Sequence, residues 1–163
     1  MNAQDVLKYG NLTLLDTLKG VPKSEWETGG VCGVWSVKQI VAHLTSFEHL
    51  VAEVLSTFSE GGPMPHMEMM GKEGPQRFND IQVEIRQDKT ADEQLAEYKE
   101  AHDRVMSLIV KIPEETRRQN GTLPWYGEEY DLEDFLVYIN YAHKREHCAQ
   151  INVFRDQLSA AQS

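Results

Sequence analysis

Two histidines one helical turn apart are the residues best placed to do chemistry in this sequence. His143 and His147 are four positions apart, which puts both side chains on one face of a helix, where they can bind the same metal ion. Their neighbours are apolar at helical intervals, so both rings are predicted to face inward. Two neutral rings in an apolar interior would each need a separate hydrogen-bond partner, whereas one divalent ion satisfies both. The pair therefore predicts metal ligation.

His43 is the candidate for a third ligand. At 100° per residue it lies at the edge of an apolar arc between residues 40 and 58, whereas Glu48 and His49 are predicted to point elsewhere. A lone inward histidine is more often a hydrogen-bonded core residue than a ligand, so this assignment requires the helices of His43 and His143 to be neighbours. Three imidazoles would leave a coordination position open, as in catalytic zinc sites. Zinc, nickel, copper and cobalt all suit imidazole.

Three further polar residues are candidates for a supporting role. His102 is central to an apolar face, where it is either a core histidine or a site residue. Gln150 lies in the stripe one turn past His147, and a buried amide there is predicted to hydrogen-bond beside the metal or to another core group. Glu146 lies about 60° from the direction of His143, which suits either an acid–base role or a solvated helix edge.

Residues 143–147 also spell H-x-x-E-H, the signature of the inverzincin metalloproteases with Glu146 as general base. Those enzymes take a further acidic ligand from far downstream. Asp156 is the only acidic residue after His147. The sequence therefore disfavours a protease.

The elements that must position these residues are helices. Ser36 with Gln39 and Thr90 with Glu93 are capping boxes, and Asp131 is a third helix start. The expected helices cover residues 3–19, 37–59, 76–87, 91–112 and 132–158. Residues 61–75 are Met- and Gly-rich and are predicted to form a loop, and residues 114–130 carry turn signals.

One amphipathic stripe on each long helix is typical of a four-helix bundle. The expected fold class is all-α, with a short extra helix and long loops between the second and third long helices. The length of 163 residues matches one domain, so residues 1–163 are predicted to form a single unit.

Composition excludes several classes of function. The formal net charge of −10 is the opposite of what a nucleic-acid binder needs. No apolar run is long enough to span a bilayer and no export signal begins the chain, so a cytoplasmic protein without membrane contact is expected. Cys32 and Cys148 are then expected to stay reduced.

Two motifs together resemble the DinB/YfiT-like metalloprotein superfamily. They are WSVKQIVAHL at residues 35–44 and His143-x-x-x-His147-x-x-Gln150-Ile151 about a hundred residues later. The resemblance implies an up-down-down-up bundle in which His43, His143 and His147 bind one divalent metal, often zinc or nickel. It also implies frequent homodimers and activities on small molecules. Characterised relatives include S-transferases and isomerases that use bacillithiol, mycothiol or glutathione, and some proposed hydrolases.

Two chemistries and one alternative follow. The metal would either activate water for hydrolysis or hold a low-molecular-weight thiol as thiolate, and the resemblance alone favours the thiol. A carboxylate-bearing thiol would prefer cationic groups near the site, and the basic candidates are Lys144, Arg145, Arg117 and Arg118, which are otherwise solvated charges. The alternative is a non-catalytic metal-binding or stress-associated bundle. A solvent-reachable pocket at the metal would favour an enzyme.

Two segments, one aromatic and one Met-rich, each have two possible roles. Trp125 and Tyr126 either wall the pocket or cap the end of the bundle. The methionines of the 61–75 segment either form an adaptable lid over an apolar substrate or belong to a disordered loop.

Overall fold

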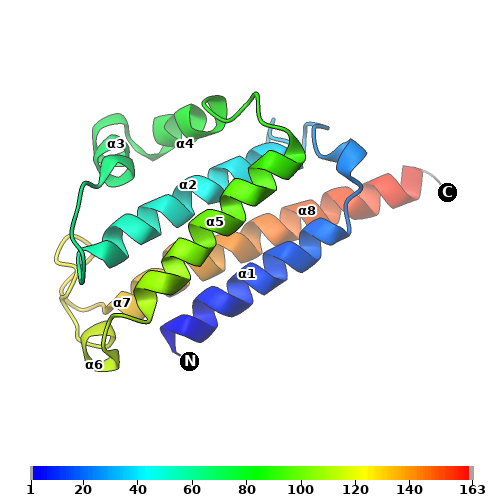
Figure 1. Cartoon of the computed structure of the whole chain (residues 1–163). Helices are drawn as coiled ribbons and strands as arrows, with labels where there is room; N and C mark the ends of the chain where they lie inside the picture. The colour runs from blue at the N-terminus through cyan, green and yellow to red at the C-terminus, as the bar shows by residue number, and fades with distance from the viewer. Residues whose placement is uncertain (1, 162–163) are drawn as a thin grey trace.

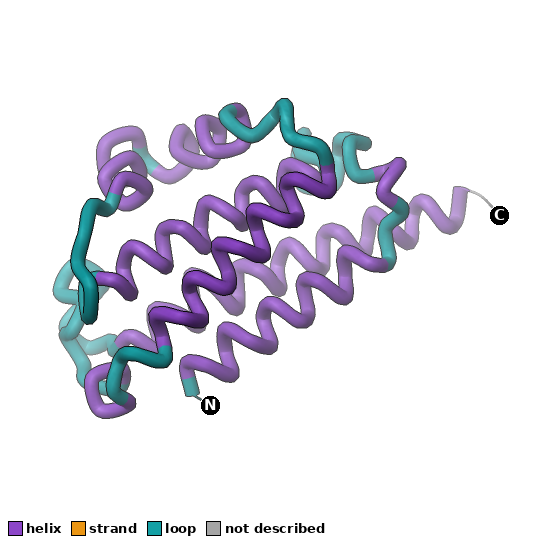
Figure 2. Tube along the Cα trace, in the orientation of Figure 1, coloured by secondary structure: helices purple, strands orange, loops and turns teal. Residues whose placement is uncertain are grey.

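The computed structural model describes residues 2–161, and within that range the chain is helical and contains no strand (Figure 2). The expected all-α class is confirmed. An isolated bridge joins Cys32 to Trp35 in the turn before the second long helix. A short 3-10 helix, η1 (Lys23–Glu25), precedes that turn.

Four long helical segments lie side by side (Figure 1). They are α1 (Ala3–Lys19), α2 (Val37–Ser56), α5 (Ala91–Ile109) and a final run made of α7 (Leu132–Leu136), η2 (Val137–Ala142) and α8 (His143–Ala161). In Figure 1, α1 and α8 run in one direction, and α2 and α5 run in the other. The extensive packing of α2 on α5 and of α1 on α8 holds the segments together.

Local sequence signals explain where these segments begin. The Ser36 hydroxyl accepts from the backbone N–H of Gln39, and the Gln39 side chain accepts from the Ser36 N–H. Thr90 with Glu93 forms the same reciprocal box at the start of α5. Asp131 caps α7 in the predicted place. Each cap satisfies backbone donors that the first turn of a helix leaves free, worth about 1 kcal/mol.

The expected loop at residues 61–75 is wrong, because most of it is helix α3 (Pro65–Glu73), followed by α4 (Pro75–Glu84). No local side chain caps α3. Instead, the Glu53 carboxylate of α2 accepts hydrogen bonds from the backbone N–H groups of His66 and Met67. The cap therefore comes from a residue that the local sequence of α3 does not contain.

Smaller differences concern the ends of three helices and one additional short helix. The second and third long helices end three residues before the expected positions, at Ser56 and Ile109. The 114–130 segment, predicted to hold turns alone, begins with the single helical turn α6 (Glu114–Arg117). The final helical run extends to Ala161 instead of ending at about residue 158.

A π-helical segment interrupts the last long helix just before its two histidines. Residues Val137–Ala142 form η2, whereas the sequence pattern predicts an uninterrupted α-helix there. A π turn contains more residues than an α turn, so residues on either side of it keep a different phase from a regular helix. The apolar stripe before η2 and the histidines after it are therefore not related by 100° steps.

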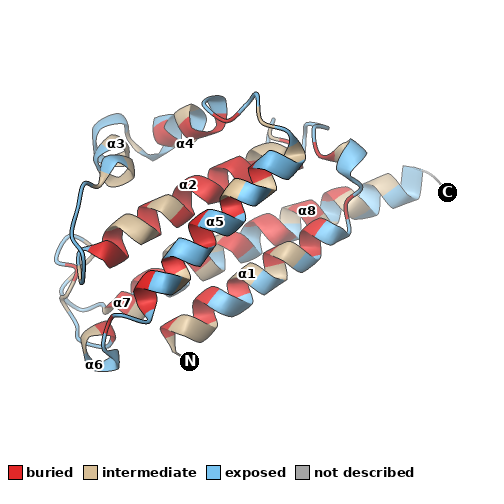
Figure 3. Cartoon of the chain, in the orientation of Figure 1, coloured by how far each residue is buried: buried red, intermediate tan, exposed pale blue. Residues whose placement is uncertain are grey.

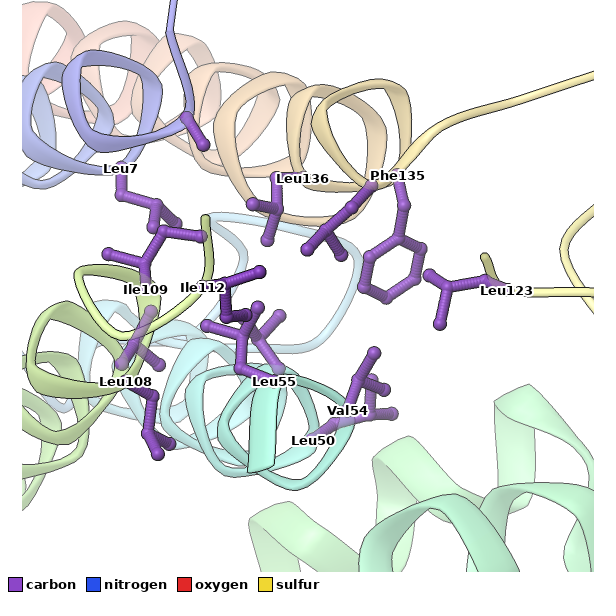
Figure 4. Packing of buried hydrophobic residues seen from close by; sticks show 14 residues of the cluster. Leu7, Leu50, Val54, Leu55, Leu108, Ile109, Ile112, Leu123, Phe135 and Leu136 are labelled. Carbon is purple, nitrogen blue, oxygen red and sulfur yellow. The ribbon is translucent and has the colours of Figure 1, made fainter. Parts of the chain in front are cut away.

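Two apolar clusters form the core. The first joins α1, α2, α5 and α7 at one end of the molecule (Figure 4). The second lies toward the other end and contains Trp26, Ile40, Leu44, Tyr98 and Ile151. Helix α2 is buried along most of its length, because α5, α8, α3 and α4 all pack against it (Figure 3).

None of the helices in residues 2–161 has the length and apolarity needed to cross a membrane. Both cysteines are free thiols, as expected from the sequence. Burial raises the pKa of the Cys148 thiol above its ordinary value.

Candidate metal centre

His43 of α2 and the two histidines of α8 form a single cluster. Nε2 of His43 lies 2.8 Å from Nε2 of His143. The latter atom also lies 3.1 Å from Nε2 of His147. The candidate ligand atoms of all three residues lie within 4.8 Å of one another. The structure therefore brings together the three histidines that the sequence predicts to converge.

Apolar and aromatic groups surround the cluster. His43 and His147 are buried, and His143 is partly exposed. The Phe47 ring lies edge-on to His143 at 4.5 Å between centroids, and Trp35 lies 5.0 Å from His43. This environment excludes much of the water that would otherwise hydrate the rings.

All three imidazoles are held in the neutral form at neutral pH. Burial, together with the neighbouring His143 and His147 rings, lowers the pKa of His43 from 6.5 to about 2. Burial and His147 lower the pKa of His143 to about 4. Burial also lowers the pKa of His147. A metal ion binds neutral imidazole, so little proton release accompanies its binding at pH 7.

Hydrogen bonds fix the orientation of the two α8 rings. Nδ1 of His147 lies 2.8 Å from Oε1 of Gln150. The amide oxygen can only accept, so this nitrogen carries the proton and Nε2 keeps its lone pair. The His143 ring bonds to the backbone of Ile139. Since its Nε2 faces the other two rings, Nδ1 is the nitrogen available for that bond. Gln150 thus lies beside the histidine cluster. The sequence allowed either this place or a hydrogen bond to another core group.

These residues fit a metal ion. One proton shared among three Nε2 atoms can satisfy only one of the two close contacts, and it leaves a buried acceptor unpaired. A cation between the rings would satisfy all three lone pairs. In a tetrahedral site with metal–nitrogen distances of about 2.0–2.1 Å, ligand nitrogens are about 3.3–3.4 Å apart. The observed 2.8 and 3.1 Å are shorter than that spacing by about 0.2 to 0.6 Å, so a small outward shift of the rings would admit the ion.

A cavity of about 290 Å³ opens beside the cluster. His43 and His143 form part of its wall, and the other lining residues are Phe47, Asn79, Tyr138, Ile139, Ala142 and Glu146. Helix α4 supplies Asn79, so the α3–α4 arm covers the side of the bundle on which the cavity lies. A larger cavity of about 690 Å³, beside Trp26 and Arg155, has no histidine in its lining. The smaller cavity is therefore the one next to the chemistry.

A buried ionic network lies next to the cluster and corrects one prediction. Glu48, expected to point away from the interior, is fully buried. Its carboxylate accepts from Lys144 Nζ at 2.6 Å and from the Asn140 amide at 2.7 Å. Nδ1 of His102 lies 3.0 Å from the other carboxylate oxygen. His102 therefore belongs to this network and does not join the histidine cluster.

The network holds α8 against its neighbours. Lys144 follows His143 in the chain, and its ammonium also donates to Asn140 of η2 at 2.9 Å. Burial alone raises the pKa of Glu48, but Lys144 and His102 outweigh that effect and bring it to about 2. The carboxylate is therefore charged and paired, as a buried charge must be.

The four basic candidates do not line the cavity. Lys144 is buried against Glu48, and Arg117 is buried in α6. Arg145 and Arg118 are exposed, and Arg118 pairs with Glu114 and Glu133.

Three other predicted residues lie outside the centre. Trp125 and Tyr126 pack on Phe135 at the far end of the bundle and do not line the cavity. Asp156, the residue that the protease interpretation required, bonds to Arg155. Of the two expected positions for Trp125 and Tyr126, the structure therefore shows the bundle end.

Sequence reasoning missed Glu48 and Asn79. Residues 39–52 contain a single residue of the Asp, Glu, Lys or Arg types, which is Glu48. A helix that is apolar all round is a buried helix, so this signal could have placed the carboxylate inside. Asn79 lies in a helix of mixed polarity, and nothing in its sequence neighbourhood marks it.

Comparison with protein families decides the family. The model of the DinB superfamily matches residues 12–151. The chain belongs to the DinB superfamily. No curated protein and no solved structure matches the chain significantly. The DinB match begins within α1 and ends within α8, and it includes the three clustered histidines.

Proposed function

We propose that this DinB protein is a metal-dependent hydrolase of a small molecule. The observation that carries the proposal is the cavity beside the histidines, because Glu146 lines it together with His43 and His143. A metal held only to brace helices would be closed off by protein ligands. An open side leaves room for water and substrate.

The residues suggest a division of roles. His43, His143 and His147 would hold the ion, which supplies a Lewis acid that polarises the scissile group and acidifies water. Glu146 takes a proton from the attacking water, whose oxygen forms a bond to the electrophilic carbon. The bond from that carbon to the leaving group then breaks, and the leaving group receives the proton from Glu146. Phe47 and Ile139 limit the access of bulk water.

Hydrolysis is favoured over thiol transfer by the charges at the site. A thiol cofactor that carries carboxylates needs cationic partners, and none of the four basic candidates lines the cavity. The side chain that is charged there, Glu146, would repel such a cofactor. Several divalent ions suit three imidazoles, and the family resemblance favours zinc or nickel among them.

The proposal includes the architecture that carries the site. Residues 1–163 would form one up-down-down-up four-helix bundle, with the ion between the second and the last long helix. Support comes from the family match over residues 12–151 and from the opposed directions of the long helices in Figure 1.

Metal analysis is the first test. Elemental analysis should find about one zinc or nickel ion per chain in the purified protein and almost none in a His143→Ala, His147→Ala double variant. His49→Ala is the matched control, because His49 lies outside the cluster and contacts Glu97 and His66. Equal metal content in the double variant and the wild type would refute the site.

Activity is the second test. The metal-loaded protein should hydrolyse members of a panel of small chromogenic esters and amides. Glu146→Gln should lower kcat by about 100-fold or more while the metal content stays unchanged. A metal-loaded protein that hydrolyses no member of the panel, or a Glu146→Gln variant with the wild-type rate, would contradict a hydrolytic role.

A further inference from the structure

The last helical run buries different sequence faces on the two sides of its π segment. Before the segment, the buried residues of α7 are Leu132, Phe135 and Leu136. After it, the buried residues of α8 are Lys144, His147, Cys148, Ile151 and Phe154. Counted along a regular α-helix at about 100° per residue, the centres of these two sets point about 100° apart. The π segment takes up this difference, because it contains one residue more than the α turn that it replaces.

A polar side chain is buried inside the π segment. Asn140 of η2 is 2% exposed. Its amide nitrogen donates to Oε1 of Glu48 at 2.7 Å, and its amide oxygen accepts from Lys144 Nζ at 2.9 Å. Lys144 Nζ also donates to the same Glu48 oxygen, at 2.6 Å. Asn140, Glu48 and Lys144 thus form a polar ring that joins α2, the π segment and the first turn of α8.

The polar ring and the histidine cluster depend on the same rotation of α8. Lys144 directly follows His143, and Glu48 lies on the same helix as His43. Asn140 and Lys144 are one helical turn apart, so one carboxylate can accept from both only while they face α2. A rotation of α8 by about 100° would separate Lys144 from Glu48 and would turn the α8 histidines away from His43. The winding that closes the ring is therefore the one that assembles the cluster.

We infer that Asn140 and Glu48 are positioning residues for the metal centre, which hold the π winding that directs the α8 histidines toward His43. This inference rests on the metal site of the proposed function. In the described part of the chain, neither residue belongs to the three candidate ligands or to the cavity lining, so each acts through the rotation of α8. Apolar packing is non-directional, whereas a buried hydrogen bond is lost when its donor turns away. The ring therefore sets the rotation more sharply than the apolar core does.

Two variants open the polar ring without leaving a buried charge alone. Asn140→Leu removes both amide hydrogen bonds and keeps the Glu48–Lys144 pair. The double variant Glu48→Gln, Lys144→Met replaces that pair by neutral groups. Gln94→Met is the matched control, because Gln94 of α5 is also a fully buried amide, and it donates to Thr45 of α2 at 3.0 Å, outside the last helical run.

Zinc affinity is the first measurement. The Kd for zinc is obtained at pH 7 by competition with a chromogenic chelator, and the free energy of unfolding is measured by urea denaturation for each variant. Both ring variants should bind zinc about tenfold more weakly than the wild type, because the ion binds only the molecules that have the required winding. Gln94→Met should keep the wild-type Kd, although it also loses stability. A purely structural role would lower stability in all variants and leave the Kd of the folded protein unchanged.

Amide hydrogen exchange of the metal-free protein is the second measurement. Residues 137–142 should exchange faster in both ring variants than in the wild type, and they should keep the wild-type rates in Gln94→Met. If one ring variant does not fold, the other decides. A wild-type Kd for zinc in a folded ring variant, or unchanged exchange of residues 137–142, would overturn the inference.

The two proposals fail separately. A wild-type protein that binds no zinc would refute the metal centre, while faster exchange of η2 in Asn140→Leu would still support the ring as the holder of the π winding. Equal zinc affinity in the wild type and the ring variants would refute the positioning role and leave the metal centre and the hydrolase intact.

Discussion

Replacing Lys144 by Met is expected to destabilise the protein strongly. Lys144 is 1% exposed and its partner Glu48 is fully buried. The variant leaves a charged carboxylate in the interior with one partner fewer. Breaking a buried ion pair from one side costs about 3–5 kcal/mol. The low pKa of Glu48 leads to a similar free energy. A fall of this pKa from 4.5 to about 2 corresponds to about 3 kcal/mol of stabilisation of the charged carboxylate.

Urea denaturation at pH 7 measures this cost. Lys19→Met is the matched control, because Lys19 pairs with Asp16 on the surface, where the two side chains are 77% and 81% exposed. The Lys19→Met variant should lose less than about 1 kcal/mol of its free energy of unfolding. Adding Glu48→Gln to Lys144→Met should recover part of the lost stability, because the amide is uncharged and its oxygen still accepts from His102 or Asn140.

The pH profile gives a second readout of the same pair. The folded-state pKa of Glu48 lies below its ordinary value, so its stabilisation is complete above about pH 4.5 and is lost as the pH falls toward 2. Lys144→Met should flatten this acid dependence. A Lys144→Met variant no less stable than Lys19→Met, with an unchanged acid profile, would refute the network as a stabilising element.

Three further outcomes are expected. Burial lowers the pKa of His143 to about 4, so zinc content at about pH 5.5 should equal that at neutral pH, and loss of metal by that pH would contradict the neutral cluster. Glu53→Gln should speed amide hydrogen exchange in α3 while changing the global free energy of unfolding by less than about 1 kcal/mol; unchanged exchange would mean that the cap is dispensable. Gly127→Ala should cost more than about 1 kcal/mol in urea denaturation, since φ is 136° and a Cβ would lie 2.8 Å from the Tyr130 ring. Gly30→Ala, with φ of 89° and open space around it, should cost less, and equal costs would rule out the clash.

The sequence predicted the elements whose signals are local. The bounds of α1 are correct because an apolar stripe is followed directly by Gly20 and Pro22. The start of α2 is correct because Ser36 and Gln39 cap it from within the same turn. Helix α3 was missed because its cap, Glu53, comes from another helix.

The candidate site also contains residues that a local sequence pattern predicts and residues that it does not. The pairing of His143 with His147 was predicted from the i, i+4 spacing and the inward face, whereas their convergence with His43 was implied by the family resemblance. Glu48 was misplaced because the stripe argument assumes that a helix has a solvent side, and α2 has almost none there. The cavity wall at Asn79 depends on how α4 folds back over α2, which no single helix pattern encodes.

The position of the histidine cluster depends on the π winding at Val137–Ala142. A π turn behaves as an α-helix with one extra residue. If the same number of residues wound there as a regular α-helix, everything after the segment would rotate by about 100° relative to α7. His143 and His147 would keep their spacing and the H-x-x-E-H letters, yet both would turn away from His43. A homologue of the same length without the π winding would therefore retain both sequence signatures and lack the three-histidine cluster.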